Sequence, residues 1–206
     1  MPNWCENRIS VLGVREEVTF FLHSLLGVPQ AFKANEVQDF SDKEVELRIA
    51  LEQFPTFRLS SLLPVPLNLR REESGEAVYN WCIEFWGTKW DAELEVCHTS
   101  LDLEPIDGVY YMEIDFEVDT AWGPPIEWLR RVSKMFPTLD FSIVYYESGL
   151  AYAGSAYCRE GEIVEELDLQ AELDEDSYWE FLIKNFGITK EELKEEGLIR
   201  EENHDE

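Results

Sequence analysis

Acidic side chains form the most conspicuous chemical pattern in this sequence. Between residues 109 and 118, Glu113, Asp115 and Glu117 alternate with apolar residues. This spacing of two predicts a β-strand with one apolar face and one wet, acidic face. A second set of acidic residues follows near the C-terminus, at Glu162, Glu165, Glu166, Asp168, Glu172, Asp174, Glu175 and Asp176. A rigid surface of such carboxylates would attract a basic partner and could imitate duplex DNA, which presents one charge per ~1.7 Å of its axis.

Three segments rich in aromatic residues offer a different kind of chemistry. They are residues 2–7 (PNWCEN), 86–91 (WGTKWD) and 120–125 (TAWGPP), and each lies at an expected element boundary. Their side chains could form a small-ligand or nucleotide pocket in which the rings stack a base and Lys89 meets an anion. They could equally form a secondary core that holds the inserted segment on the sheet, since aromatic clusters are usually packing. The candidate pocket residues are Asn3, Trp4, Trp86, Thr88, Lys89, Trp90, Thr120 and Trp122.

Recognisable catalytic and metal-binding patterns do not occur in the sequence. His23, His98 and His204 form no H-x-x-x-H or H-x-H pair, and the four cysteines form no C-x-x-C pair. Neither a phosphate-binding loop nor a G-x-S-x-G motif appears. We therefore expect no metal and no cofactor, and the sequence favours a binding protein over an enzyme without excluding catalysis.

Net charge narrows the class of partner. The chain has 206 residues, with 44 acidic and 17 basic side chains and a formal charge of −27. Such a field repels nucleic acids and anionic membranes and attracts basic protein surfaces. The acidity could also serve solubility alone. The densest part begins at residue 160, where 18 acidic and four basic residues give −14 in the last 47 residues. The start of the sequence lacks the apolar region of a signal peptide, and no apolar run approaches the ~20 residues of a membrane helix, so we expect a cytoplasmic protein.

The elements that would position these residues follow from hydrophobic periodicity. Strands are expected at residues 6–12, 93–103, 109–118, 141–146, 150–158 and 163–169, and helices at 15–26, 76–86 and 125–136. Residues 57–63 read as a short helical turn, and residues 45–51 fit either a strand or a helix. Asp176 or Ser177 could cap a further helix that Gly187 would end, and residues 189–192 form a capping box for a second short helix through Glu196.

The order of these elements predicts an α+β fold of ferredoxin-like, split βαβ type. Two helices would cover one face of an antiparallel sheet, and the strands after Gly149 would extend that sheet as a meander. Residues 1–170 would form this domain, with a helical insert at 28–90, and residues 171–206 an acidic helical appendage. In this order Trp4 and Trp122 should approach each other at one end of the sheet.

The three aromatic segments, together with Phe136-Pro137 and residues 146–149 (YESG), resemble the YubB ferredoxin-like domain family. The resemblance covers about residues 2–158. It implies a ferredoxin-like fold and an origin on bacteriophages or conjugative plasmids, and it implies no established activity.

Two functional hypotheses follow. In the first, the protein is an acidic inhibitor that presents a DNA-like surface to a basic host protein, such as a nucleic-acid-binding restriction or CRISPR-type factor. In the second, it is a small-ligand or nucleotide-binding module, enzymatic or not, that uses the Trp-rich cluster. Direct binding to nucleic acid is not expected, because the exposed face of the 109–118 strand is acidic.

Overall fold

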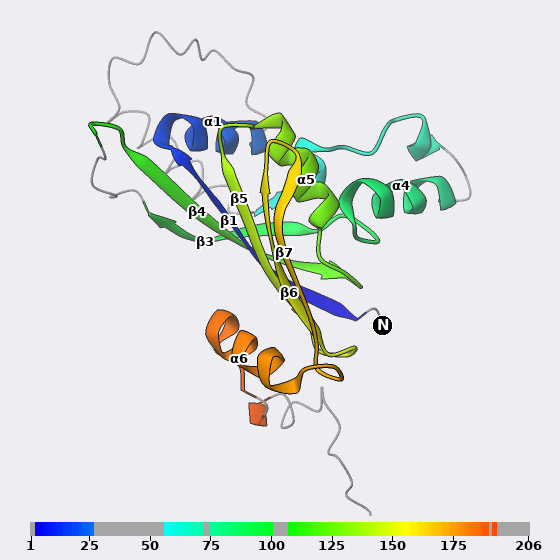
Figure 1. The fold of residues 1–206 in the computed structure, drawn as a ribbon. Helices are drawn as coiled ribbons and strands as arrows, with labels where there is room; N and C mark the ends of the chain where they lie inside the picture. Colours follow the sequence, from blue (N-terminus) through cyan, green and yellow to red (C-terminus); the bar gives the residue numbers. More distant parts are fainter. Residues whose placement is uncertain (1–2, 27–55, 72–74, 101–106, 190, 193–206) are drawn as a thin grey trace, which may run out of the picture.

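A single antiparallel sheet organises the chain. The computed structural model describes residues 3–26, 56–71, 75–100, 107–189 and 191–192. Seven strands lie in the order β2-β3-β4-β1-β5-β6-β7 (Figure 1). Their bounds are β1 Trp4–Val14, β2 Thr56–Arg58, β3 Glu93–Ser100, β4 Tyr111–Ala121, β5 Asp140–Glu147, β6 Tyr152–Arg159 and β7 Glu162–Gln170.

Helices lie on both sides of this sheet. They are α1 (Arg15–Leu25), α3 (Leu59–Leu62), α4 (Glu76–Trp86), α5 (Ile126–Met135) and α6 (Glu175–Phe186), with a short 3-10 turn at Leu69–Arg71. Helices α1 and α5 cover one face, α4 packs against α5, and α6 lies across the opposite face (Figure 1). No helix in the described ranges is long and apolar enough to cross a membrane.

The expected split βαβ order is present. Elements β1, α1, β3, β4, α5 and β5 follow one another along the chain, and their strands lie in the order β3-β4-β1-β5. Strands β6 and β7 continue the sheet beyond β5, as the predicted meander requires. The predicted α+β architecture is therefore observed.

The main core lies between the sheet and helices α1 and α5. Met112, Ile114, Phe116 and Val118 of β4 are all buried, as their alternation predicted. Helix α5 buries Trp128, Leu129 and Val132 against this core. The strict alternation of β4 thus fixes which face carries the core and which face carries Glu113, Asp115, Glu117 and Asp119.

Residues 28–90 differ from the expected helical insert. The segment predicted as one helical turn divides into β2, which pairs with β3, followed by α3. The insert thus adds an edge strand to the sheet as well as helices. Pairing with β3 overrides the weak local preference of a three-residue segment. The ambiguous segment 45–51 lies outside the described residues.

Helix α6 begins earlier than predicted. Its N-cap is Asp174, whose carboxylate accepts a hydrogen bond from the Ser177 amide at 3.1 Å, so the predicted caps Asp176 and Ser177 lie within the first turn. Gly187 ends the helix in the left-handed conformation, as expected. Tyr178 and Leu182 of this helix are buried against Tyr146 on β5 and Ala153 on β6. The division into domains at residue 170 stays a prediction.

The capping box at residues 189–192 is confirmed, whereas the rest of the short helix expected after it lies outside the described residues. The Thr189 amide donates to Glu192 Oε2 at 2.8 Å, and the Glu192 amide donates to Thr189 Oγ1 at 3.3 Å.

Candidate functional site: an acidic groove on the open face of the sheet

The face of the sheet opposite α1 and α5 is covered by α6 only in part. Along β1, Trp4, Glu6 and Arg8 are exposed, whereas Cys5 and Asn7 between them are buried. The period of two in a strand places these three exposed side chains on the open face. Their neighbours on β4 and β3 carry mostly carboxylates.

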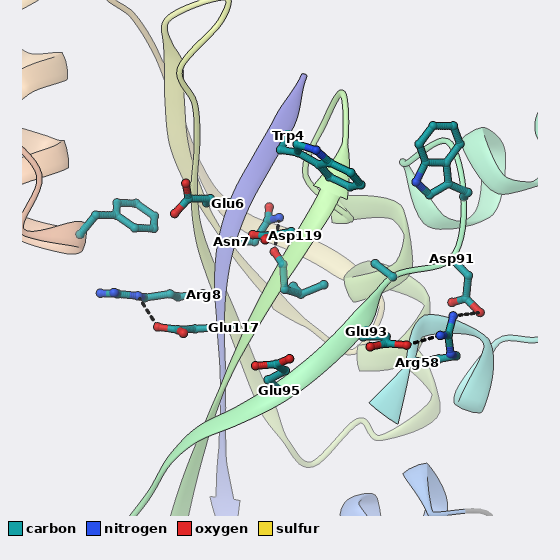
Figure 2. A pocket seen from close by; sticks show the side chains of 14 residues that line it. Trp4, Glu6, Asn7, Arg8, Arg58, Asp91, Glu93, Glu95, Glu117 and Asp119 are labelled. Carbon is teal, nitrogen blue, oxygen red and sulfur yellow. Dashed lines mark hydrogen bonds and ion pairs between the residues drawn. The ribbon is translucent and has the colours of Figure 1, made fainter. Parts of the chain in front are cut away.

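These side chains line a groove of about 640 Å³, which we call the open-face groove (Figure 2). Six carboxylates line it, at Glu6, Asp91, Glu93, Glu95, Glu117 and Asp119. Two cations, Arg8 and Arg58, lie among them. Three aromatic side chains complete the lining, from Trp4, Trp90 and Phe186, the last residue of α6.

Strand register places like charges directly opposite each other in this groove. Glu6 on β1 pairs with Asp119 on β4, and Glu95 on β3 pairs with Glu117 on β4. Such like-charge pairs destabilise a sheet. Partial burial, reinforced by Glu117 and then Glu95, raises the pKa of Asp119 above its ordinary value. The groove therefore favours bound cations.

Arg8 is already engaged by the protein itself. Its Nε lies 3.3 Å from the Glu117 carboxylate, and its guanidinium donates to the Asn185 carbonyl at 2.7 Å. The same guanidinium lies 5.2 Å from the centre of the Phe186 ring. Arg8 therefore ties the C-terminal end of α6, one wall of the groove, to the sheet.

Arg58 is engaged in the same way. Its guanidinium forms an ion pair with Glu93 and lies 4.0 Å from Asp91. With both arginines committed, Glu95 and Asp119 have no cationic partner within the described ranges. These two carboxylates are free to receive a cation from outside.

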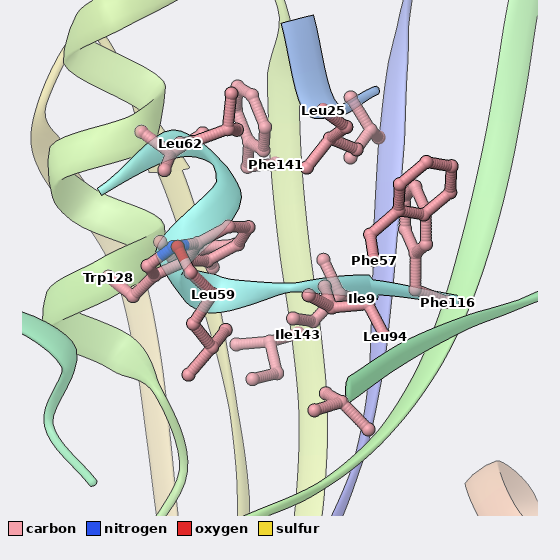
Figure 3. Close-up of a cluster of buried hydrophobic side chains, with 14 of the residues drawn as sticks. Ile9, Leu25, Phe57, Leu59, Leu62, Leu94, Phe116, Trp128, Phe141 and Ile143 are labelled. Carbon is pink, nitrogen blue, oxygen red and sulfur yellow. The ribbon is translucent and has the colours of Figure 1, made fainter. Parts of the chain in front are cut away.

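Burial of its neighbours fixes the position of Arg58. Phe57 and Leu59 are buried on either side of it in the main core (Figure 3). The indole of Trp128 on α5 donates to the Leu59 carbonyl at 2.9 Å. Because strand neighbours point to opposite faces, this anchoring turns Arg58 toward the open-face groove.

Of the predicted acidic strand residues, Glu117 lines the open-face groove, and Glu113 and Asp115 continue along the same face. Ser10 Oγ lies 2.8 Å from a Glu113 carboxylate oxygen and 2.5 Å from one of Asp115. Ser10 of β1 therefore lies between these two acids and can donate its single hydroxyl proton to either of them.

The predicted acids of β7 are divided between the two faces of the sheet. Glu166 and Asp168 pair with Ala156 and Gly154 of β6, on the face of the sheet that carries the main core. Glu165 pairs with Tyr157 and therefore lies on the opposite face. The Tyr145 hydroxyl donates to Asp168 at 2.6 Å. Glu162 begins the strand opposite Arg159. All four acids are exposed, but they do not form one continuous surface.

The remaining predicted acids lie at the start of α6. Glu172 is in the turn before it, Asp174 caps it, and Glu175 and Asp176 occupy its first turn. Acidic residues at this position stabilise a helix through its dipole. Their placement thus has a local structural reason.

The structure brings together part of the predicted Trp-rich cluster. The rings of Trp4 and Trp90 meet edge to face with centroids 6.4 Å apart. Lys89 Nζ lies 5.4 Å from the Trp90 ring and 5.5 Å from the Trp122 ring. The Trp122 amide donates to the Asn3 carbonyl at 3.0 Å, which joins the two loops.

The other three predicted pocket residues are buried and structural. Trp86 is 1% exposed, and its indole donates to the Leu63 carbonyl at 2.9 Å. The Thr88 hydroxyl donates to the Ala121 carbonyl at 3.0 Å, and that of Thr120 to the Gly123 carbonyl at 2.8 Å. These bonds fix the loops that carry Trp90 and Trp122.

Comparison with known proteins identifies the type of domain. Residues 85–184 match the family model of a ferredoxin-like domain in Api92-like protein. The match runs from the end of α4 into α6 and agrees with the observed topology, so the chain contains a ferredoxin-like domain. A crystal structure of a protein api92 from Yersinia pseudotuberculosis is similar at a TM-score of 0.44 and 11% identity, over 83% of this chain and 99% of that chain. No curated protein matches the chain.

Of the residues that line the open-face groove, the sequence predicted Trp4, Trp90 and Glu117 as site residues and missed the rest. Glu6 and Arg8 alternate with buried residues in β1, so their exposure was available from the period of the strand. Arg58, Glu93 and Glu95 were not found, because their positions depend on the pairing of β2 with β3.

No group of three or more His, Cys, Asp or Glu residues within the described ranges is arranged to hold a metal ion.

Proposed function

We propose that the protein binds a basic segment of a partner protein in the open-face groove. The observation that carries the proposal is the pair Glu95 and Asp119, two groove carboxylates without a cationic partner among the described residues. Burial raises the pKa of Asp119, and repulsion from Glu117 and Glu95 raises it further; an arriving cation would relieve that repulsion.

Aromatic side chains make arginine the favoured cation. Trp4 is 49% exposed and Trp90 41% exposed, beside the carboxylates of the groove. A guanidinium can stack on an indole and bind a carboxylate with two parallel hydrogen bonds. A lysine ammonium lacks the planar fork needed for both contacts. We therefore expect an arginine-rich segment.

The proposal extends to the class of partner. A net charge of −27 speeds encounter with basic proteins and opposes direct contact with nucleic acid. The resemblance to the YubB family suggests a gene carried by phages or plasmids, which host defence systems attack. We infer a cytoplasmic inhibitor of a nucleic-acid-binding host factor of restriction or CRISPR type, which presents its carboxylates where that factor takes a phosphate backbone.

Peptide titration tests the groove. A fluorescein-labelled nona-arginine peptide is titrated with the protein at 50 and 300 mM NaCl, and anisotropy gives Kd. The double variant Glu95→Gln/Asp119→Asn should weaken binding about tenfold at low salt, equivalent to about 1.4 kcal/mol. The matched control Glu172→Gln/Glu180→Gln removes the same charge from exposed sites near α6.

If the two double variants weaken peptide binding equally, only the net charge matters, and the proposal that the groove is the binding site is refuted. The partner class needs a separate experiment, affinity capture from a bacterial lysate at low salt. Recovery of a nucleic-acid-binding protein that the groove variant fails to retain supports inhibition. Retention of such a protein equally by wild type and variant would refute this partner class for the groove.

A further inference from the structure

A second hollow, of about 410 Å³, lies beside α4 and differs in chemistry from the open-face groove. Val65, Cys82 and Trp86 form its floor, and all three are buried. Burial, followed by the nearby Asp91 carboxylate, raises the pKa of the Cys82 thiol to about 11. The thiol is therefore protonated at neutral pH, and the floor is apolar.

The floor is also rigid. Val78, Cys82 and Trp86 follow at intervals of four and share one side of α4. The Trp86 indole is fixed by its bond to the Leu63 carbonyl and by edge-to-face packing on Trp81 at 5.3 Å. A flat ring could lie on this floor without displacing it.

The rim carries cations in an otherwise acidic protein. Lys89 Nζ lies 5.7 Å from the Tyr79 ring and 5.4 Å from the Trp90 ring, and both rings line the hollow. Arg70 contributes a second cation. Neither cation has a carboxylate partner within the described residues, although Arg8, Arg58 and Arg159 all do.

Asp91, the acid of this rim, is already bound. The Ser60 amide and hydroxyl donate to its two carboxylate oxygens at 3.1 and 2.6 Å. Arg58 Nη1 lies 4.0 Å from Asp91 Oδ2. The unpaired charge at the hollow is therefore positive.

We propose that this hollow binds a small aromatic anion. Its ring packs between the exposed rings of Tyr79 and Trp90, above the buried floor, and its anionic group meets Lys89 and Arg70. An unpaired cation pair beside a preformed apolar floor supplies both parts of such recognition. The hollow borders the open-face groove and shares Trp90 and Asp91 with it, but Lys89 and Arg70 line the hollow and not the groove.

A pair of probes separates the two parts. 8-Anilino-1-naphthalenesulfonate carries an anionic group, and N-phenyl-1-naphthylamine has the same rings without it. At 150 mM NaCl we expect the wild type to bind the sulfonate at least fivefold more tightly than it binds the neutral amine. Lys89→Met and Arg70→Gln should each weaken sulfonate binding about fivefold and leave the neutral probe unchanged. Lys184→Met on α6 is the matched control.

Filling the hollow tests its location. Val78→Trp should abolish binding of both probes, whereas Ile83→Trp, on an exposed position of the same helix, should not. Thermal melts establish that each variant is folded. Equal effects of Lys89→Met and Lys184→Met, or unchanged binding in a folded Val78→Trp protein, would overturn the proposal. Glu95→Gln/Asp119→Asn should leave both probes bound, so failure of the groove proposal remains distinguishable.

Discussion

Glu6 on β1 and Asp119 on β4 are direct cross-strand partners, so two like-charged side chains face each other on the open side of the sheet. Glu95 and Glu117 repeat the arrangement on the next strand pair. Folding would be easier without these pairs, because opposed like charges weaken a sheet. The groove therefore carries a stability cost that a cationic partner would offset.

Asp119→Asn should stabilise the free protein. Removal of one charge relieves the repulsion with Glu117 and Glu95, and we expect the free energy of unfolding to rise by about 0.5 kcal/mol. Urea denaturation at pH 7 measures the difference. Glu172→Gln, in the exposed turn before α6, should change stability by less.

The gain from Asp119→Asn should depend on pH. The pKa of Asp119 is raised in the folded state, so the folded protein binds this proton more tightly than the unfolded chain. The wild type therefore loses stability as pH rises from the unfolded value of 3.8 through the folded pKa. The variant should exceed the wild type at pH 7 and approach it near pH 3.5. A constant difference across this range would contradict the assignment.

Arg8→Met should loosen α6. The substitution removes the bond to the Asn185 carbonyl and the ion pair with Glu117. Hydrogen exchange should quicken in the last turn of α6 while β4 and β5 keep their protection, with a loss of about 1 kcal/mol in local stability. Arg159→Met, which loses ion pairs with Asp140 and Glu160 away from α6, is the control.

Gly154→Ala should destabilise the sheet strongly. A Cβ atom at this position would overlap the Leu167 carbonyl oxygen and the Tyr145 hydroxyl. We expect a loss of about 1–3 kcal/mol from this overpacking, measured by thermal or urea denaturation. Gly123→Ala meets its nearest atom at an ordinary 3.7 Å and should be tolerated, so comparable losses in both variants would argue against the packing at β6.

Cys97 should be the first thiol to react with Ellman's reagent. It is exposed on β3, whereas Cys5, Cys82 and Cys158 are buried. Burial raises the pKa of Cys5 to about 12 and that of Cys158 to about 11, which suppresses their thiolates further. Absorbance at 412 nm should show one equivalent released from the native protein and the others only in denaturant. Cys97→Ser should remove the early phase.

The elements that sequence predicted well are those with a long apolar period and a clear end signal. Helix α4 spans Glu76–Trp86 as expected, because Gly75 and Gly87 bound it in left-handed conformations. Strand β4 alternates without interruption, which fixed its buried face. In contrast, β2 has only three residues, which is too short for an alternating pattern, and it forms a strand because it pairs with β3.

Residues of the candidate site could be predicted only where the alternation within a single strand determines which face a side chain lies on. Alternation in β4 identified Glu117, but the approach of Glu95 and Glu6 depends on strand register, which one sequence does not contain. Trp86 shows a second limit. Its position in an aromatic segment gave no sign that the ring would be buried and form the floor of a second hollow.

Arg8 and Phe186 meet in the groove although 177 residues lie between them in the chain. Because α6 follows the groove strands in the chain, the floor of the groove leaves the ribosome before the wall that α6 forms. A nascent chain that stops before α6 therefore has the acidic strands without the wall that shapes them. A partner that recognises the whole groove would bind the protein only after α6 has been made and folded.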